Sequence, residues 1–385
     1  GERRDLGTSM MLTRGFASKA VGEAHARYLE LCEAYGASDQ IAFAIHGLYH
    51  YHFVRAEPGK GHDYGSRFLA LAKEAKDDYF LAQAHFAIGG AFLMEGRYPD
   101  SRGNLERALQ VYSPDRHNRF IREWGYDLGV FCRGFLSHAL WHLGFPDKAR
   151  AASQEAIAIA EAIDHPFSLA VALAYDVLLQ QFCRKPQKLL ESVSKLEQLC
   201  DEYGFKYYKA WAGIMRGWGE AETNAKPEAL DHMRSALIAL KATNARTRCT
   251  LYLSLIAGRL LADNEIDAAN EILVQTETLL EGSDERWVAA DISRLRGLLE
   301  FAQSADAAKA QVHFERARTI ARGQSARSLE LRAASDQARL LQKNGKVCEA
   351  RDHLAPLYGW FTEGFDTPDL REAKVLLERL SQACR

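Results

Sequence analysis

The chain has 385 residues, of which 47% are hydrophobic and 26% charged, and its formal net charge is −2. This balance gives no overall electrostatic attraction toward nucleic acids or anionic membranes. No apolar run approaches the roughly 20 residues that cross a bilayer, and the first ten residues do not resemble a secretion signal. We therefore expect a cytoplasmic protein without direct nucleic-acid or membrane contacts.

The cysteines are seven in number, scattered along the chain and free of any CxxC pair. An odd number of scattered cysteines without CxxC disfavours a disulfide framework and a zinc site. The pattern therefore predicts reduced, mostly buried thiols. The seven are Cys32, Cys132, Cys183, Cys200, Cys249, Cys348 and Cys384.

A turn residue followed by the start of a helix recurs about every 40 residues. Successive turn residues are separated by 40, 48, 40, 40, 40, 41 and 40 positions. A fixed period of this length is typical of solenoids, in which each repeat buries its apolar face against its neighbours. The turn residues are Ala56, Gly96, Gly144, Arg184, Asn224, Asn264, Ala305 and Gly345.

Each repeat is expected to be a helical hairpin. Around Gly96, Ile88 and Phe92 share one face of a first helix, and Leu105 and Ala108 share one face of a second. Proline is tolerated in the first turn of a helix, where its missing N–H has no partner to lose. Five prolines fall two or three residues after a turn residue: Pro58, Pro99, Pro146, Pro186 and Pro227.

Because no strand-like alternation occurs, the predicted fold is all-α: a right-handed superhelical solenoid of about eight hairpins. Residues 1–35 are expected to form a partial N-terminal repeat with capping helices, 36–360 the repeats, and 361–385 a C-terminal capping helix. The small residues Ala108, Ala149 and Ala350 should be buried where helices meet.

The longest separation, between Gly96 and Gly144, adds about eight residues within 113–127. Insertions in repeat arrays often carry function, so Tyr126 and Asp127 are candidate binding residues. The alternative is a merely longer connection.

The repeat resembles the tetratricopeptide repeat, although its period exceeds the usual 34 residues. It looks most like the repeat domain of the maltose-regulon transcription activator. It also resembles the C-terminal region of multidomain bacterial regulators that carry an adenylate/guanylate cyclase or winged-helix domain and a predicted ATPase. The stretches that carry the resemblance are 12–17, 140–144, 327–333 and, most specifically, 357–370. This resemblance implies a regulatory module within a longer polypeptide.

Sequence motifs for catalysis are missing. Pro58-Gly59-Lys60-Gly61 resembles part of a phosphate-binding loop, but His62 stands where serine or threonine should follow the lysine. No GxSxG elbow or pair of carboxylates stands out. We expect no enzymatic activity and no cofactor.

His46 and His50 lie one helical turn apart and could in principle share a metal ion. No third ligand is evident, because His52 points away from both, and we expect no metal site. The other interpretation is a polar and aromatic stripe on a helix that faces a groove. His138 and His142 repeat the same spacing.

In solenoids that resemble tetratricopeptide repeats, the first helices line the concave surface, at positions two, five, nine and twelve of each repeat. In the early repeats these positions hold aromatic residues and histidines, whereas the last repeat has Arg332, Ser335, Arg339 and Gln342. We expect either an aromatic-lined binding channel or, alternatively, ordinary core packing. With the insertion, the candidates are Phe43, His46, His50, Phe86, Tyr126, Asp127, His138, Trp141, Trp211 and Trp218.

The leading hypothesis is a non-enzymatic regulatory or sensor domain that binds a protein or ligand inside a larger bacterial signalling protein. One alternative is a receptor for a small-molecule inducer. The other is a stand-alone scaffold that holds a peptide or helix of a partner. An apolar pocket would favour the receptor, whereas an open groove with charged side chains would favour the scaffold. A second copy of the chain could also be a partner.

Overall fold

The computed structural model describes residues 17–35, 38–113, 117–224, 228–304 and 306–384. Within these ranges the chain forms nineteen helices and no strand, which confirms the all-α prediction. No helix among the described residues is long and apolar enough to cross a membrane. The helices are α2 (Lys19–Tyr35), α3 (Ser38–Val54), α4 (Pro58–Ala75), α5 (Asp78–Met94), α6 (Tyr98–Val111), α7 (His117–Trp124), α8 (Leu128–His142), α9 (Pro146–Ala162), α10 (Pro166–Phe182), α11 (Pro186–Tyr203), α12 (Lys206–Asn224), α13 (Glu228–Ala242), α14 (Cys249–Ala262), α15 (Ile266–Glu281), α16 (Ala289–Ser304), α17 (Ala307–Gly323), α18 (Arg327–Lys343), α19 (Val347–Trp360) and α20 (Pro368–Ala383).

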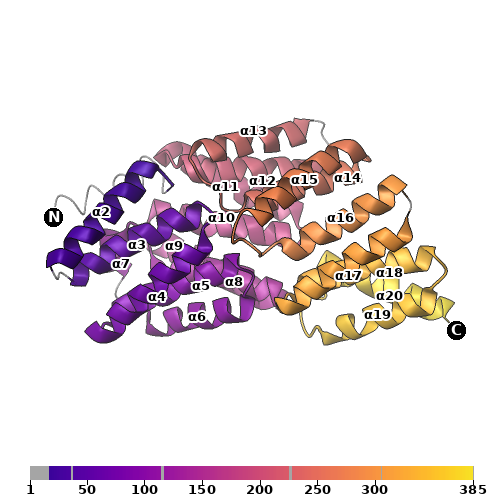
Figure 1. Ribbon diagram of the computed structural model, residues 1–385, viewed down its shortest axis with the longest axis horizontal. Helices are drawn as coiled ribbons and strands as arrows, with labels where there is room; N and C mark the ends of the chain where they lie inside the picture. The colour runs from indigo at the N-terminus through magenta and orange to yellow at the C-terminus, as the bar shows by residue number, and fades with distance from the viewer. Residues whose placement is uncertain (1–16, 36–37, 114–116, 225–227, 305, 385) are drawn as a thin grey trace.

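Sixteen of these helices form eight consecutive hairpins, from α3–α4 to α18–α19, as in a tetratricopeptide-like solenoid. Helix α2 precedes the hairpins, α20 follows them, and α7 occupies the predicted insertion. Helices α2 and α20 lie at opposite ends of the longest axis (Figure 1). The number of hairpins is therefore confirmed, whereas the right-handed sense of the superhelix stays a prediction.

The hairpin turns lie where the sequence placed them. Six turn residues have the positive φ that ends a helix in the left-handed conformation. Asn224 is the last residue of α12, whereas Ala305 and Pro227 lie outside the described residues. Four of the five prolines occupy the first turn of a second helix. The six turn residues are Ala56, Gly96, Gly144, Arg184, Asn264 and Gly345.

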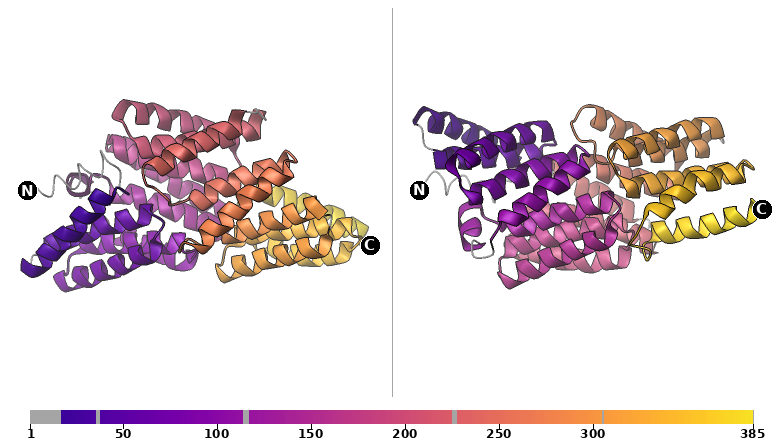
Figure 2. Two further views of the ribbon diagram at one scale, coloured as in Figure 1. Left: turned by 45° about the horizontal axis from the view of Figure 1, so that its top comes forward. Right: turned by 90° about the horizontal axis from the view of Figure 1, so that it is seen from below.

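First and second helices differ in burial. In α5, a first helix, fourteen of seventeen residues are buried. In α6, its partner, only Tyr98, Ser101, Leu105 and Ala108 are buried. A helix enclosed on all sides must be apolar around its circumference, whereas an outer helix needs one apolar stripe. Both further views show the resulting rows of stacked helices (Figure 2).

Replacing Ala149 with leucine should lower the free energy of unfolding by about 1–3 kcal/mol, because extra methylenes do not fit a close helix contact. Ala149 is fully buried in α9, as are Ala108 and Ala350 in their helices. Chemical denaturation of this variant and of a control measures the change in the free energy of unfolding. The control, Ala151→Leu on the exposed face of α9, should stay within about 0.5 kcal/mol, and equal losses in the two variants would contradict the predicted helix register.

The superhelix closes on itself, so that distant repeats touch. The carbonyl of Val54, at the end of α3, accepts backbone hydrogen bonds from Arg246 and Thr247, just before α14. The carbonyl of Met94, at the end of α5, accepts from Arg286 and Trp287, just before α16. The same relation joins α8 to α18, where the Ser328 hydroxyl donates to the Trp141 carbonyl at 2.5 Å. The later hairpins thus pack against the turn ends of the earlier ones.

A connecting segment at 361–367, here called the C-terminal strap, adds a further contact of this kind. The Glu363 carboxylate accepts from the backbone N–H groups of Asp147 and Lys148 at 2.9 and 3.1 Å, which caps the first turn of α9. Asp366 pairs with Arg150 at 2.8 Å. Gly364 has φ +75°, and a Cβ there would lie 2.0 Å from the Pro146 ring, so only glycine fits. The stretch with the most specific family resemblance therefore joins the last hairpin to the middle of the chain.

The prediction that all cysteines are reduced is wrong for one pair. Cys348 and Cys384 form a disulfide, with their Cα atoms 5.3 Å apart. Cys348 lies in the first turn of α19 and Cys384 directly follows α20, and these two packed helices bring the residues together. Their separation of 36 residues hides this proximity in the sequence. The other five cysteines are free and buried, as predicted.

Candidate functional site

The predicted aromatic channel is not an open surface. All ten candidate residues are buried, and even the most exposed, His50 and Trp218, show only 6% of their surface. The expectation of partly exposed side chains converging on one concavity is therefore wrong. The ten are Phe43, His46, His50, Phe86, Tyr126, Asp127, His138, Trp141, Trp211 and Trp218.

Closure of the superhelix explains this burial. The loops before α14 and α16 contact the ends of α3 and α5. Helix α7, which belongs to the insertion, covers Phe43 and His46 within α3. For example, Trp124 of α7 stacks on Phe43 and lies 4.1 Å from His46 between ring centroids. The aromatic positions of the early repeats are thus core, which is the alternative that the sequence left open.

Five of the ten candidates do meet inside this core. The Tyr126 hydroxyl lies 3.2 Å from His50 Nε2 and 3.3 Å from His46 Nε2. It also donates to Gln83 Oε1 at 3.3 Å. Phe86 contacts the His50 ring. Phe43 stacks on Trp124, which in turn contacts His46. The histidine pair predicted from spacing is therefore part of a buried hydrogen-bond network.

Asp127 has a structural role as the N-cap of α8. Its carboxylate accepts from the backbone N–H of Val130 at 3.0 Å and from the Tyr112 hydroxyl at 2.8 Å. The predicted insertion thus supplies a helix cap and part of the core.

No group of three or more His, Cys, Asp or Glu side chains within the described ranges is arranged to hold a metal ion. His52, which the sequence placed on the other side of the helix, instead bonds Glu57 at 2.6 Å.

Burial keeps the core histidines uncharged. Desolvation lowers the pKa of His50, His138 and His142 to about 3 in each case. His138 Nε2 donates to the Tyr175 carbonyl at 2.9 Å, and His142 Nδ1 bonds the His138 carbonyl at 2.8 Å. Each bond uses the single N–H that a neutral ring can donate, while the other nitrogen of His138, Nδ1, is buried without a hydrogen-bond partner.

Acidification should therefore destabilise the fold below pH 6.5. The unfolded chain protonates these histidines near pH 6.5, whereas the folded chain resists protonation until about pH 3, so the free energy of unfolding falls as the pH is lowered through this window. Each buried histidine contributes a slope of about 1.4 kcal/mol per pH unit. Denaturation of His142→Gln between pH 5.5 and 4.5, well below the unfolded pKa, should show a free-energy slope smaller by about this amount. The exposed control His232→Gln should keep the wild-type slope; an unchanged slope in both would refute the argument.

An open groove exists farther along the chain, and we call it the charged groove. It has a volume of about 280 Å³ and is lined by first helices of five hairpins, α10 to α18, together with α20. Helices α12 and α14 contribute Trp218 and Leu255 to its wall. The charged lining residues are Arg184, Glu222, Arg259, Asp291, Arg294, Arg332, Asp336, Arg339, Asp369 and Glu372.

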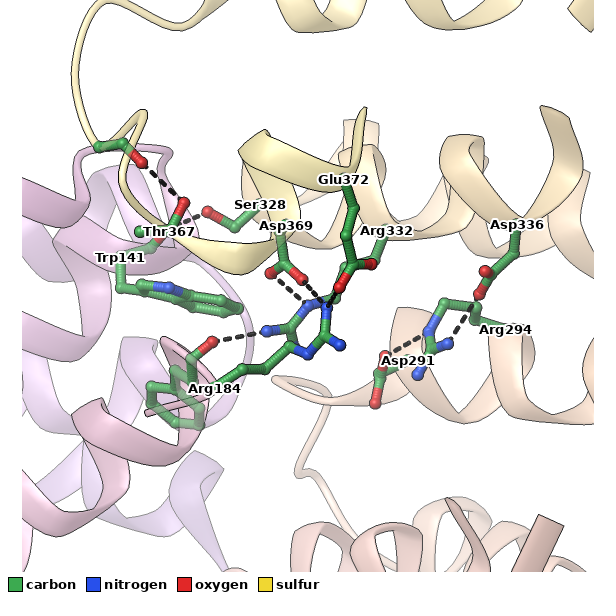
Figure 3. A network of polar contacts seen from close by, with 12 residues as sticks. Trp141, Arg184, Asp291, Arg294, Ser328, Arg332, Asp336, Thr367, Asp369 and Glu372 are labelled. Carbon is green, nitrogen blue, oxygen red and sulfur yellow. Dashed lines mark hydrogen bonds and ion pairs between the residues drawn. The ribbon is translucent and has the colours of Figure 1, made fainter. Parts of the chain in front are cut away.

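Arginines and carboxylates alternate along part of this groove (Figure 3). Asp369 accepts from Arg332 at 2.7 Å and from Arg184 at 3.0 Å. Glu372 pairs with Arg184 at 2.9 Å and with Arg339 at 3.2 Å. The chain of pairs crosses from α10 to α20 and α18, so it connects parts of the molecule that are distant in sequence.

The same alternation continues to α16. Asp336 pairs with Arg339 at 2.7 Å and with Arg294 at 2.8 Å, and Arg294 pairs with Asp291 at 2.7 Å. Burial alone would raise the pKa of Asp291, but the guanidinium groups of Arg294 and Arg332 hold it below its usual range. Asp291 therefore stays ionised although it is mostly buried.

One polar atom in the groove wall lacks a partner. Gln181 lines the groove, and its buried side-chain oxygen accepts no hydrogen bond. An unpaired buried acceptor is costly, and a ligand N–H would satisfy it.

Of the ten candidate binding residues, only Trp218 lines this groove. The repeat positions that predicted the groove also gave Arg332, Ser335 and Arg339, all of which line it. The candidate set does not contain these three residues, because they are charged or polar rather than aromatic. The position within the repeat therefore predicts the groove residues, whereas aromatic content does not.

No protein-family model and no curated protein matches this sequence. A solved structure of a Rap protein complexed with competence and sporulation factor is similar to this chain, with a TM-score of 0.64 and 10% identity. The match covers 99% of this chain and 98% of that one. The likeness is one of fold. The apo form of RapI, at 10% identity, covers 98% of both chains with a TM-score of 0.46, and yeast Tom70, at 12% identity, covers 100% of this chain and 96% of that one with a TM-score of 0.37. With TM-scores below 0.5, these two likenesses are too weak to support a conclusion about this chain.

Proposed function

We propose that the charged groove binds an extended segment of a partner protein, and that the chain acts as a non-enzymatic regulatory or sensor repeat domain. The alternation of arginines and carboxylates carries this proposal, because it can pair with charged side chains of both signs along a peptide. The orphaned oxygen of Gln181 offers a backbone N–H a partner. The similar Rap structure was determined with a bound factor, which supports a binding role.

In this proposal the domain belongs to a larger bacterial signalling protein with a cyclase, ATPase or transcription-regulator output, acting in the cytoplasm. Residues 1–35 and 361–385 cap the repeats of 36–360. Support comes from the specific resemblance of 357–370, a stretch that places Asp369 in the groove. Nucleic acid and membrane are unsuitable partners, because the carboxylates that stand beside the groove arginines would repel a row of phosphates. A second copy of the chain is a further candidate partner.

A display selection tests the proposal. Peptides selected against the wild-type chain should bind at least about tenfold more weakly to a double variant with Arg339→Glu and Glu372→Lys, which reverses this ion pair and also places like charges beside Asp336 and Arg184. The circular dichroism spectrum and melting temperature of this variant show whether it keeps the fold. The matched control reverses the exposed pair Asp231 and Arg234 on α13, outside the groove, and should bind normally. Peptides that bind both variants equally would refute the groove as their site.

A second hollow favours the alternative of a small-molecule effector. It has a volume of about 780 Å³, within the usual range of ligand pockets, and lies between α15, α16 and α17. Leu280, Ile292 and Ile320 provide apolar wall, and Arg296 and His313 provide polar groups. Compounds that bind this hollow should raise the melting temperature of the wild type and of the double variant with Arg339→Glu and Glu372→Lys. They should not raise the melting temperature of Ile320→Gln, whose substitution lies in the wall of the hollow.

A further inference from the structure

A small cavity lies in the core, apart from the charged groove. Its volume is about 30 Å³, and its walls include Tyr49, Phe135, Tyr175, Trp211 and Arg248. One water needs roughly 10–15 Å³ of such space, so the cavity accepts about two waters or a monatomic ion but no organic effector.

The cavity carries a positive charge that no carboxylate neutralises directly. Arg248 is 1% exposed, and none of the described carboxylates lies within 4.0 Å of its guanidinium nitrogens. Its Nη2 donates to the Tyr175 hydroxyl at 3.1 Å, and its guanidinium carbon lies 4.6 Å from the centre of the Trp211 ring. Arginine stays protonated even when buried, so the charge has to be stabilised in place.

The closest candidate for a counter-charge is engaged elsewhere. Glu285 accepts from the backbone N–H of Arg248 at 3.0 Å and from the hydroxyls of Thr247 and Thr250, each at 3.1 Å. These bonds hold the Arg248 backbone, at φ +65°, at the start of α14. The carboxylate thus positions Arg248 without contacting its guanidinium.

Three donor groups on the residues that line this cavity have no hydrogen-bond partner. They are Arg248 Nε, Trp211 Nε1 and the Tyr49 hydroxyl, and all three residues are more than nine-tenths buried. The arginine and tryptophan N–H groups can only donate. A neutral water would accept these bonds, whereas an anion would accept them and also place a negative charge in contact with the guanidinium, which Glu285 supplies only at longer range.

We propose that this cavity binds a monatomic monovalent anion of the size of chloride, held by Arg248, Trp211 and Tyr49. The anion completes the core where the loop before α14 meets α3 and α12. This site is independent of the charged groove and of its proposed partner.

Two measurements test the site. Crystals grown with bromide should show an anomalous scattering peak in the cavity. The melting temperature in chloride should exceed that in gluconate at equal ionic strength by several degrees, because a ligand that binds only the folded state stabilises it. An empty cavity in the bromide map, or equal melting temperatures in the two salts, would overturn the proposal.

Two conservative variants assign the donors. Tyr49→Phe removes one donor and keeps the ring, and Trp211→Phe removes one donor and keeps a smaller aromatic side chain, so each should reduce the chloride-dependent rise in melting temperature. The matched control is Arg318→Met, because Arg318 is also buried with an unpartnered Nε but lies in α17, away from the cavity. The control should keep the full chloride-dependent rise in melting temperature. Loss of this rise in Arg318→Met would refute the assignment, and so would a full rise in both Tyr49→Phe and Trp211→Phe.

Discussion

Replacing Arg332 with alanine should lower the free energy of unfolding by about 2–3 kcal/mol, because it removes the nearer of the two arginines that pair with the mostly buried Asp369 carboxylate and leaves Arg184 as its remaining partner. Arg332 donates to Asp369 at 2.7 Å and to the Phe182 carbonyl at 2.5 Å, and it lies 4.8 Å over the Trp141 ring. Its side chain is 14% exposed, so solvent screens these interactions only weakly. Urea denaturation followed by circular dichroism measures the loss.

The control for this variant is Arg371→Ala on the exposed face of α20. It removes the same side chain from a neighbouring surface and should change the free energy of unfolding by less than about 0.5 kcal/mol. A small effect at Arg332 would mean that the contacts between α18, α20 and the end of α10 do not contribute to stability.

The second large effect is expected for Trp211→Ala, with a loss of about 3–5 kcal/mol. Trp211 is 1% exposed and packs between Tyr175, Tyr208 and Arg248. Truncation therefore opens a cavity in the core. Trp360→Ala, where the ring is 38% exposed, is the control and should cost clearly less. If Trp211 were instead a binding residue on an open groove, its variant would melt like the wild type.

Much of the fold was predictable from local pattern. A residue such as Gly96 or Gly345 marks each turn, and Pro146 or Pro186 marks the start of the following helix, because both constraints act within a few residues. Closure of the superhelix was not predictable in this way. It depends on contacts such as Val54 with Arg246, which join residues far apart in the sequence.

The binding surface could be predicted only in part for the same reason. The repeat positions correctly assigned Arg332 and Arg339 to the concave side, where the groove stays open. The equivalent positions Phe86 and His138 became core, because later parts of the chain cover them. Position within a repeat thus predicts which side a residue faces, whereas the winding of the whole array decides whether solvent reaches it.

The contacts that close the superhelix also have a consequence for folding. In an open array each repeat touches only its neighbours, so the terminal repeats can fray one at a time. Here the ends of α3, α5 and α8 are bonded to residues near 246, 286 and 328. Removing the last hairpins would expose core in the first half as well as at the cut. We therefore expect one cooperative unfolding transition and, because contacts of such high sequence separation form late, slower folding than the helical content alone would suggest.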